Sequence, residues 1–250
     1  MPTDQPHKTA IITGASSGIG RATALLLAES GVQVALVSRR GDSLQQLADR
    51  ILSTGVKAIA IPTDITDCQQ VQSMVSAVLD KFGRIDILVN SAGLIDVAPT
   101  VEASVQRWQE LIQVNLLGTM YCCHAVAPVM EAQQRGYIVN VSSVAGRTAS
   151  AGVSAYNASK WGVGAFSEAL RQELCKSGVR VTVVEPGWVE TPLYDEIASG
   201  AMQERVSRWQ QGIGEPLLPE DVAGAIWFAL SQPQRVNVNE ILLRPTGQVN

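Results

Sequence analysis

Residues 13–20 read Thr-Gly-Ala-Ser-Ser-Gly-Ile-Gly, between an apolar β-branched run at 9–12 and a segment with the pattern of a helix. Glycines at such a turn let the backbone bend sharply and approach an anion closely, and the helix amino end offers unpaired N–H groups. The glycines fall as G-x-x-x-G-x-G rather than the commoner G-x-G-x-x-G. The pattern therefore predicts a variant of the dinucleotide-binding loop, the alternative being an ordinary glycine-rich turn.

Short apolar runs alternate with amphipathic segments along the rest of the chain. The predicted strands are 9–12, 32–37, 58–61, 85–89, 137–141, 179–184 and 240–243. Strands buried on both faces show continuous apolar runs, and strands separated by helices are joined by right-handed crossovers. We therefore expect an α/β protein with one doubly wound domain over residues 1–250. A seven-stranded parallel sheet should carry helices on both faces and bind ligands at the carboxyl ends of its strands.

The stretch 187–219 breaks this alternation, because it has no predicted strand and carries several prolines and glycines. A long insertion after a strand end predicts a lid over the binding site. Four of its side chains could line a pocket under that lid or simply pack within it: Trp188, Tyr194, Met202 and Trp209.

Composition narrows the class of protein. The 250 residues are 46% hydrophobic and 17% charged, as in a folded globular protein. The formal net charge of -4 and the scattered basic residues predict no nucleic-acid partner. No apolar run approaches the ~20 residues that span a bilayer, and the polar start is unlike a signal peptide. The four cysteines lack metal-ligand spacing, so we expect reduced structural cysteines, no metal site and a cytoplasmic location.

The end of the second predicted strand bears on cofactor choice. An Asp or Glu normally stands about twenty residues beyond the glycine loop, where it accepts both ribose hydroxyls of NAD. Here the sequence is Ser38-Arg39-Arg40, and a hydroxyl followed by guanidinium groups favours the 2'-phosphate of NADP. Surface arginines that merely end a strand are the alternative. Asp64 could reach an adenine amino group, although a helix cap at Thr66 or Asp67 explains part of that segment equally well.

Tyr156 and Lys160 stand four residues apart in a helical pattern, which places both side chains on one helix face. Alone, such a pair is usually a solvated surface pair. Three further features favour chemistry: Ser142-Ser143 ends the fifth predicted strand, Asn115 interrupts an apolar helix, and Asn90-Ser91-Ala92-Gly93 ends the fourth strand.

These ordered motifs resemble those of the short-chain dehydrogenases/reductases, in their common non-extended branch, over essentially the whole chain. The resemblance rests on the loop at 13–20, Asp64, the turn at 90–93, Asn115, Ser143, the Tyr156–Lys160 pair, and Pro186-Gly187 with Val189 and Thr191. One departure is Ser91, where the family usually has a second Asn. We expect it to alter modestly how that turn supports the nicotinamide pocket.

The resemblance implies a Rossmann-like fold and a role for each matching residue. The catalytic residues would be Asn115, Ser143, Tyr156 and Lys160. Tyr156 would exchange the proton, with its pKa drawn down by the charges of Lys160 and the oxidised nicotinamide, Ser143 would stabilise the substrate oxygen, and Asn115 would hold a relay water. The cofactor-binding residues would be Gly14, Ser16, Ser17, Gly18, Ile19, Gly20, Ser38, Arg39, Asp64, Ile65, Asn90, Tyr156, Lys160, Val189 and Thr191.

We therefore expect an NADP(H)-dependent oxidoreductase that interconverts a small-molecule carbonyl (ketone, aldehyde or 3-oxo acid) and an alcohol. The tail at 239–246 is similar to that of 3-hydroxy-acid dehydrogenases and of the aldehyde reductase of clavulanate synthesis. A 3-oxoacyl-carrier reductase is the alternative within the enzyme class, and a non-catalytic NADPH-binding sensor or scaffold is the alternative outside it.

Two further expectations concern contacts of the protein. Arg147 could meet a substrate carboxylate or serve a surface or interface role. The helical stretches at 104–130 and 153–176 carry apolar residues on more than one face, and by resemblance they pair two-fold in a homodimer or homotetramer.

Overall fold

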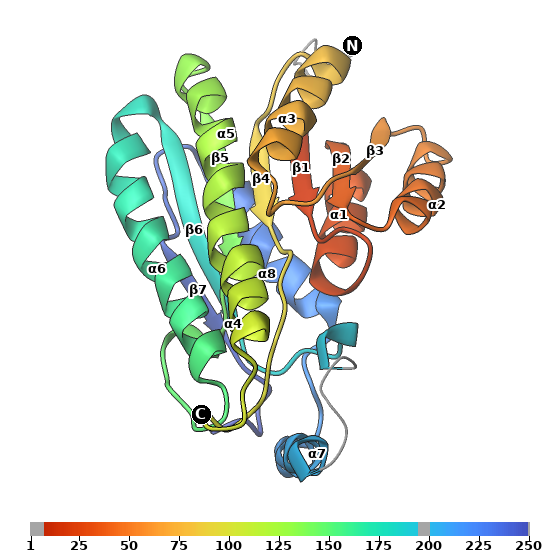
Figure 1. The fold of residues 1–250 in the computed structure, drawn as a ribbon. Coiled ribbons are helices and arrows are strands. Elements are labelled where there is room, and N and C mark those ends of the chain that lie inside the picture. The colour runs from red at the N-terminus through yellow and green to blue at the C-terminus, as the bar shows by residue number, and fades with distance from the viewer. Residues whose placement is uncertain (1–7, 195–200, 250) are drawn as a thin grey trace.

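A seven-stranded sheet forms the centre of the protein (Figure 1). The computed structural model describes residues 8–194 and 201–249. All neighbouring strands are parallel, in the order β3-β2-β1-β4-β5-β6-β7. The strands are β1 (Thr9–Thr13), β2 (Gln33–Ser38), β3 (Ala58–Pro62), β4 (Ile87–Asn90), β5 (Gly136–Val141), β6 (Val179–Pro186) and β7 (Glu240–Leu243).

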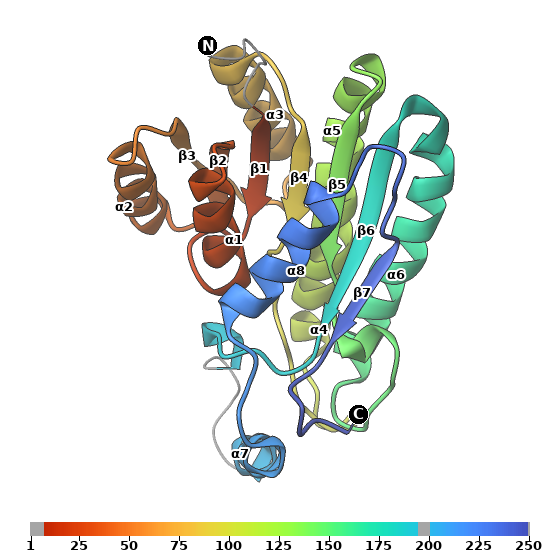
Figure 2. The same ribbon diagram turned by 180° about the vertical axis from the view of Figure 1, so that it is seen from behind.

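Helices cover both faces of this sheet, as Figures 1 and 2 show from opposite sides. One face carries α1 (Gly18–Glu29), α2 (Gly41–Leu52) and α8 (Pro219–Ser231). The other carries α3 (Cys68–Phe82), α4 (Val105–Ile112), α5 (Thr119–Ala132) and α6 (Ser154–Leu174). Each layer buries its own apolar cluster against the sheet, which explains why the central strands are apolar on both faces. The fold is the single Rossmann-like domain that the sequence predicts.

The direction in which successive strands are added to the sheet reverses between β1 and β4. The chain runs outward through β1, β2 and β3, and then returns to add β4 on the free side of β1. The loops that follow β1 and β4 therefore leave the sheet toward opposite faces, which creates the crevice where doubly wound sheets bind ligands. Helix α7 (Ala201–Ile213) lies beyond the same end of the sheet, outside both helical layers (Figures 1 and 2).

The seven predicted strands are confirmed, with small shifts at their ends. β4 begins at Ile87 rather than at Ile85, and the Asp86 carboxylate just before it accepts from the Arg84 guanidinium and the Thr9 backbone N–H. The apolar helix predicted at 104–130 consists of α4, a π-helical turn η1 (Gln113–Gly118) and α5. Asn115 lies within the π-helical turn.

Cys122 and Cys123 are buried, Cys68 and Cys175 are exposed, and all four are free thiols. Within 8–194 and 201–249, no helix has both the length and the apolar character needed to cross a bilayer. The same residues contain no group of three His, Cys, Asp or Glu side chains placed to hold a metal ion.

Candidate active site

A cleft of about 340 Å³ follows the carboxyl ends of the strands. The loops after β1, β2 and β3 line one end of it, and the loops after β4, β5 and β6, with residues of α6, line the other. The predicted site residues among its walls are Gly14, Ser16, Ser17, Gly18, Ile19, Ser38, Arg39, Asp64, Ile65, Ser143, Tyr156, Lys160, Val189 and Thr191. Fourteen of the predicted residues, far apart in sequence, thus share one cavity.

The glycine loop is packed so closely that side chains are excluded. Gly14 has a φ of +68°, and a Cβ there would lie 2.8 Å from the Ala92 backbone N. A Cβ on Gly20 would lie 2.5 Å from the Gly14 carbonyl oxygen. Helix α1 then begins after Ser17, whose side chain makes no capping hydrogen bond, so the first N–H groups of the helix face the cleft uncapped. Such a turn can hold an anionic phosphate.

Arg40 lies across this loop. Its guanidinium donates to the Ser16 hydroxyl at 2.8 and 3.2 Å and to the Ser17 hydroxyl at 2.8 Å. Its backbone N–H donates to the Ser38 hydroxyl at 3.2 Å. The guanidinium contacts thus join the end of β2 to the loop after β1. The sequence indicated a role for at least one of the two arginines. Both line the cleft, and Arg40 is the one that binds the loop serines.

Asp64 and Asp67 divide the functions that the sequence left open at this segment. The Asp67 carboxylate caps α3 by accepting from the Gln69 and Gln70 backbone N–H groups. Asp64 lines the cleft, and one carboxylate oxygen accepts from the Thr66 N–H and hydroxyl. The helix cap is therefore Asp67, and Asp64 presents its carboxyl group to the end of the cleft near β2.

Ser143, Tyr156 and Lys160 meet at the opposite end of the cleft. The Ser143 and Tyr156 hydroxyls form a hydrogen bond. The Lys160 ammonium lies 5.7 Å from the centre of the Tyr156 ring and donates to the Val141 carbonyl at 3.0 Å. The Ser143 hydroxyl is fixed in turn by the Ala145 N–H, which donates to it at 3.1 Å. The arrangement presents a phenol and a hydroxyl toward one point in the cleft, with a cation behind them.

Burial sets the acidity of this group. It raises the pKa of Tyr156, and the hydrogen bond from Ser143 opposes that rise. Burial also lowers the pKa of Lys160 to about 8. The sequence-based expectation was a Tyr156 pKa below its usual value, but the protein by itself raises it, because desolvation of a phenolate outweighs the hydrogen bond.

Asn115 is buried behind the cleft, and its side-chain amide is bound on both sides. The oxygen accepts from the Leu94 N–H at 2.7 Å, and the nitrogen donates to the Leu94 carbonyl at 2.9 Å and to Ser159 at 3.1 Å. The π-helical turn places this amide next to Gly93, where an added Cβ would lie 3.4 Å from Asn115 Oδ1 and 3.8 Å from Lys160 Nζ. Asn115 thus fixes the turn after β4 directly against Lys160.

Asn90 was predicted to bind the cofactor, but its side chain points into the protein. Its amide nitrogen donates to Asn140 on β5 at 2.9 Å and to the Cys123 sulfur at 3.3 Å. The two asparagines are register partners in the sheet. Asn90 is not one of the described residues that line the cleft. Its contacts instead join β4 to β5 and α5.

The segment after β6 closes the cleft from the α7 side. Val189 and Thr191 line the cleft, and a Cβ on Gly18 would lie 3.0 Å from Thr191 Cγ2. Tyr194 also lines the cleft and packs beside Trp209 of α7, with ring centres 6.3 Å apart, while Trp188 and Trp209 lie 6.1 Å apart. The Met202 side chain lies outside the described residues.

Sequence reasoning missed Gln248. This buried side chain near the end of the chain accepts from the Trp188 N–H at 2.9 Å, and a Cβ on the preceding Gly247 would lie 2.2 Å from the Ile213 carbonyl oxygen. The tail thus touches both Trp188, at the start of the segment after β6, and Ile213, at the end of α7. No local pattern in the sequence marks such a long-range contact.

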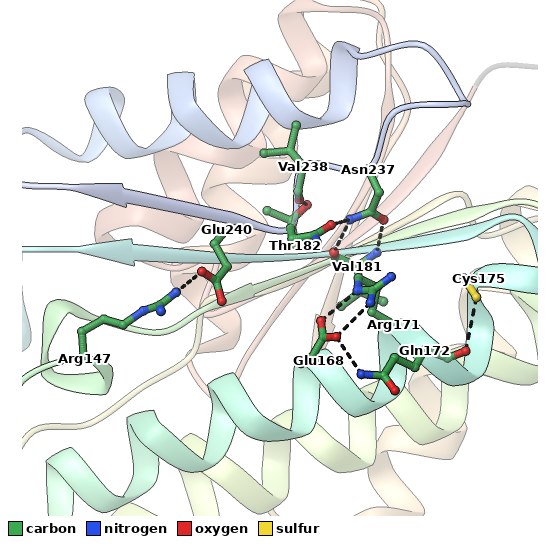
Figure 3. A network of polar contacts seen from close by, with 11 residues as sticks. Arg147, Glu168, Arg171, Gln172, Cys175, Val181, Thr182, Asn237, Val238 and Glu240 are labelled. Carbon is green, nitrogen blue, oxygen red and sulfur yellow. Dashed lines mark hydrogen bonds and ion pairs between the residues drawn. The ribbon is translucent and has the colours of Figure 1, made fainter.

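Arg147 is engaged by carboxylates of its own chain. Its Nε donates to both oxygens of the buried Glu185 at 2.8 and 2.9 Å, and its guanidinium also pairs with Glu240 of β7 (Figure 3). The sequence left open a contact with a substrate carboxylate and a surface or interface role, and these contacts do not favour the first.

Known proteins share both this fold and this order of motifs. The family model of the short chain dehydrogenases matches residues 8–201. The chain belongs to the short-chain dehydrogenase/reductase family. As a member of that family it is an NAD(P)-dependent oxidoreductase. An uncharacterised oxidoreductase of Staphylococcus saprophyticus is 41% identical over 95% of this chain and 97% of its own. The glycine betaine reductase of Emericella nidulans is 39% identical, but the matched region is only 19% of that protein.

Solved structures of the short-chain dehydrogenase/reductase family agree with the fold. A serine dehydrogenase with bound NADP+ superposes with a TM-score of 0.86, at 32% identity over 94% of each chain. A Burkholderia phymatum family member in complex with NAD also has a TM-score of 0.86, at 29% identity over 96% of this chain and 90% of its own. A 3-ketoacyl-ACP reductase of Sinorhizobium meliloti has a TM-score of 0.85, at 36% identity over 95% of this chain and 97% of its own. The cofactor of the family is thus a nicotinamide dinucleotide, of either kind.

The tight packing of the loop leads to a direct test, the Gly20→Ala variant. The added methyl group would lie 2.5 Å from the Gly14 carbonyl, and both atoms belong to the backbone, so the loop must move. Each charge-assisted hydrogen bond lost to a phosphate weakens binding roughly tenfold to a hundredfold. We expect the Kd for NADPH, measured by calorimetry, to rise at least about a hundredfold.

The matched control is Gly224→Ala in α8, where an added Cβ meets no atom within 4 Å. That variant should bind NADPH normally and gain roughly 0.5–1 kcal/mol in free energy of unfolding, because alanine suits a helix better than glycine. Normal NADPH affinity in Gly20→Ala would contradict the loop's role.

Proposed function

We propose that the protein interconverts a carbonyl compound and an alcohol by hydride transfer, with Tyr156 as the general acid or base. The observation that carries this proposal is the Ser143–Tyr156 hydrogen bond beside the buried Lys160, in the same cleft as the glycine loop. In this reading Ser143 stabilises the substrate oxygen, and Lys160 orients the nicotinamide ribose and lowers the energy of the phenolate. Asn115 acts as a positioning residue through the turn at Leu94, and it would support a relay of protons to Lys160.

The described residues fit a dinucleotide along the whole cleft. The close contacts at Gly14 and Gly20 leave room only for backbone, and the uncapped start of α1 offers N–H groups for a pyrophosphate. Ile19, Asp64 and Ile65 would contact the adenosine half. Val189 and Thr191 lie where they would contact the nicotinamide half. When bound, the reduced nicotinamide supplies a hydride, that is two electrons and one hydrogen nucleus.

The reduction moves one hydride and one proton onto the carbonyl group. A new C–H bond forms at the carbonyl carbon while the phenolic O–H of Tyr156 breaks and its proton passes to the carbonyl oxygen. The carbonyl is reduced to an alcohol, the dinucleotide is oxidised, and Tyr156 is left as a phenolate next to Lys160. A proton from solvent restores the phenol, by way of Lys160. Oxidation of an alcohol follows the same steps in reverse and needs the phenolate at the start.

We further propose that the segment 187–219 is a lid over this site within the one domain. The stacking of Tyr194 on Trp209, and the contacts of Gly247 and Gln248 with the two ends of the segment, support this assignment.

A panel of aldehydes, diketones and 3-oxo acids, monitored by NADPH consumption, tests the general proposal. Consumption of NADPH with any member supports catalysis. Binding of NADPH without turnover of any member would instead favour a sensor or scaffold. Resemblance to the 3-ketoacyl-ACP reductase supports a second candidate, reduction of 3-oxoacyl groups on a carrier, so a 3-oxoacyl thioester belongs in the panel.

Tyr156→Phe isolates the proton step. Because the change removes only the hydroxyl, we expect NADPH to bind nearly as in wild type while turnover falls at least about a thousandfold. Burial raises the pKa of Tyr156, so the phenol stays protonated through neutral pH. Wild-type reduction should therefore stay constant up to neutral pH and fall in alkali, while alcohol oxidation rises with pH. Substantial turnover by Tyr156→Phe would point to a different acid.

We propose that the cofactor is NADP(H) in preference to NAD(H), because Ser38, Arg39 and Arg40 offer a hydroxyl and two cations where a carboxylate would hold the NAD ribose. One charge-assisted hydrogen bond is worth roughly 1.5 to 3 kcal/mol, so NADPH should exceed NADH about tenfold to a hundredfold in kcat/KM. Ser38→Asp should reverse this order, since the carboxylate repels the 2'-phosphate and accepts from the ribose diol.

The two arginines should respond differently. Arg39→Ala should lower NADPH use while leaving NADH almost unchanged. Arg40→Ala should weaken the binding of both cofactors, because Arg40 holds the loop serines that would contact either one. Measuring kcat/KM with NADPH and with NADH, at fixed low salt and subsaturating cofactor, tests these assignments for the wild type and each variant. Equal wild-type efficiencies, or an unchanged Arg39→Ala, would overturn the NADP assignment and leave the dehydrogenase assignment intact.

We also propose that the protein is a homodimer or homotetramer. Val105 on α4 is 56% exposed and Trp161 on α6 is 51% exposed, although both are large apolar side chains. A helix that is apolar beyond its core-facing side buries that surface in a partner. Light scattering should give at least a dimer, and Trp161→Glu should lower the mass. A monomeric wild type at working concentration would refute this proposal.

A further inference from the structure

The walls around Tyr156 are apolar. Tyr156 forms a small cluster with Ile95 and Leu111, and Leu193, Tyr194 and Val206 pack against it. Leu94 lines the same end of the cleft from the turn after β4. The Trp188–Trp209–Tyr194 contacts back this wall from α7. A substrate whose carbonyl reaches Tyr156 therefore places its remaining atoms against hydrocarbon and aromatic surface.

The charged side chains of the cleft lie elsewhere or are already bound. Among the described lining residues they are Arg39, Arg40 and Asp64 at the β1–β3 end, and Lys160 at the Tyr156 end. The Lys160 ammonium donates to the Val141 carbonyl at the end of β5 and lies 5.7 Å from the centre of the Tyr156 ring.

Three nearby arginines are engaged outside the cleft. Arg107 of α4 pairs with Glu110 at 3.0 Å and donates to the Ile95 carbonyl at 3.4 Å. Arg147 follows Ser143 closely, but Glu185 and Glu240 hold its guanidinium. Arg205 of α7 is exposed, and it donates to the Ala151 carbonyl at 3.2 Å. None of the three is among the cleft-lining residues in 8–194 and 201–249.

We propose, building on the function proposed above, that the substrate is an uncharged, apolar carbonyl compound or its alcohol, and that carboxylates and phosphates are rejected. An apolar group gains from burial against this wall. An anionic group would lose its hydration there, and the described lining residues at this end offer no cation besides Lys160, whose ammonium is bound to the Val141 carbonyl. A buried charge that is poorly compensated is strongly unfavourable. The walls thus select for an uncharged ketone or aldehyde over a 3-oxo acid of the same size.

Pairs of compounds that differ only in charge test this selection. Methyl benzoylformate and benzoylformate share one skeleton, as do ethyl 3-oxobutanoate and 3-oxobutanoate. We expect the ester of each pair to exceed its acid at least about a hundredfold in kcat/KM with NADPH. Equal efficiencies, or a preference for the acid, would overturn the proposal. The Arg205→Ala variant should keep the ratio, and a selective loss of acid turnover in that variant would identify Arg205 as a carboxylate partner and also overturn it.

A variant that adds a positive charge to the apolar wall tests the wall's role in this selection. Leu193→Arg should narrow the ester-to-acid ratio at least about tenfold by offering a cation. Leu193→Gln, of similar size and without charge, should leave most of the ratio intact. If Leu193→Gln narrows the ratio as much as Leu193→Arg, polarity alone rather than charge sets the preference, and the proposal fails.

A binding measurement separates this proposal from the proposed function. Quenching of tryptophan fluorescence by methyl benzoylformate and by benzoylformate reports occupancy near Trp209 without any turnover, and Trp209→Phe identifies the source of the signal. Tighter binding of the ester without turnover would sustain the apolar site while removing the catalytic role. Turnover combined with tighter binding of the acid would sustain the catalytic role and overturn the apolar site.

Discussion

The contact between the loops after β1 and β4 is the constraint on which the site depends. The two loops leave the sheet in opposite directions, yet the Gly14 backbone lies against Ser91 and Ala92 with no room for a methyl group. The Thr13 hydroxyl accepts from the Ser91 and Ala92 N–H groups and fixes the distance between the loops. The glycine loop after β1 and the turn after β4 are thus held in one rigid unit.

A second buried layer transmits this rigidity to the reacting groups. The π-helical turn brings the Asn115 amide to Leu94, and Ser159 on α6 joins the same network one residue before Lys160. The Lys160 ammonium in turn is bound to the end of β5. The helix that carries Tyr156 and Lys160 is therefore joined to the turn after β4, to the π-helical turn and to the end of β5.

Much of the fold could be predicted from the sequence, because doubly buried strands show continuous apolar runs and the glycine loop has a local signature. Other features could not be predicted, because they depend on the direction of a side chain, on a distant contact or on burial. Whether Asn90 faces the cleft or the interior is decided by its register partner Asn140, fifty residues away in the chain. Gln248 acts on Trp188 from the tail. The pKa of Tyr156 depends on how completely it is buried, which no local spacing reveals.

The strand order also has an evolutionary consequence. Because the chain builds the sheet outward from β1 to β3 and only then returns to β4, successive stretches of sequence serve separate parts of the cleft. In the proposed function, residues up to Ile65 would bind the adenosine half of the cofactor, the middle of the chain would supply the proton-transferring groups, and the segment after β6 would face the substrate. Recombination between related genes at a few crossover points can therefore exchange one property while inheriting the others unchanged.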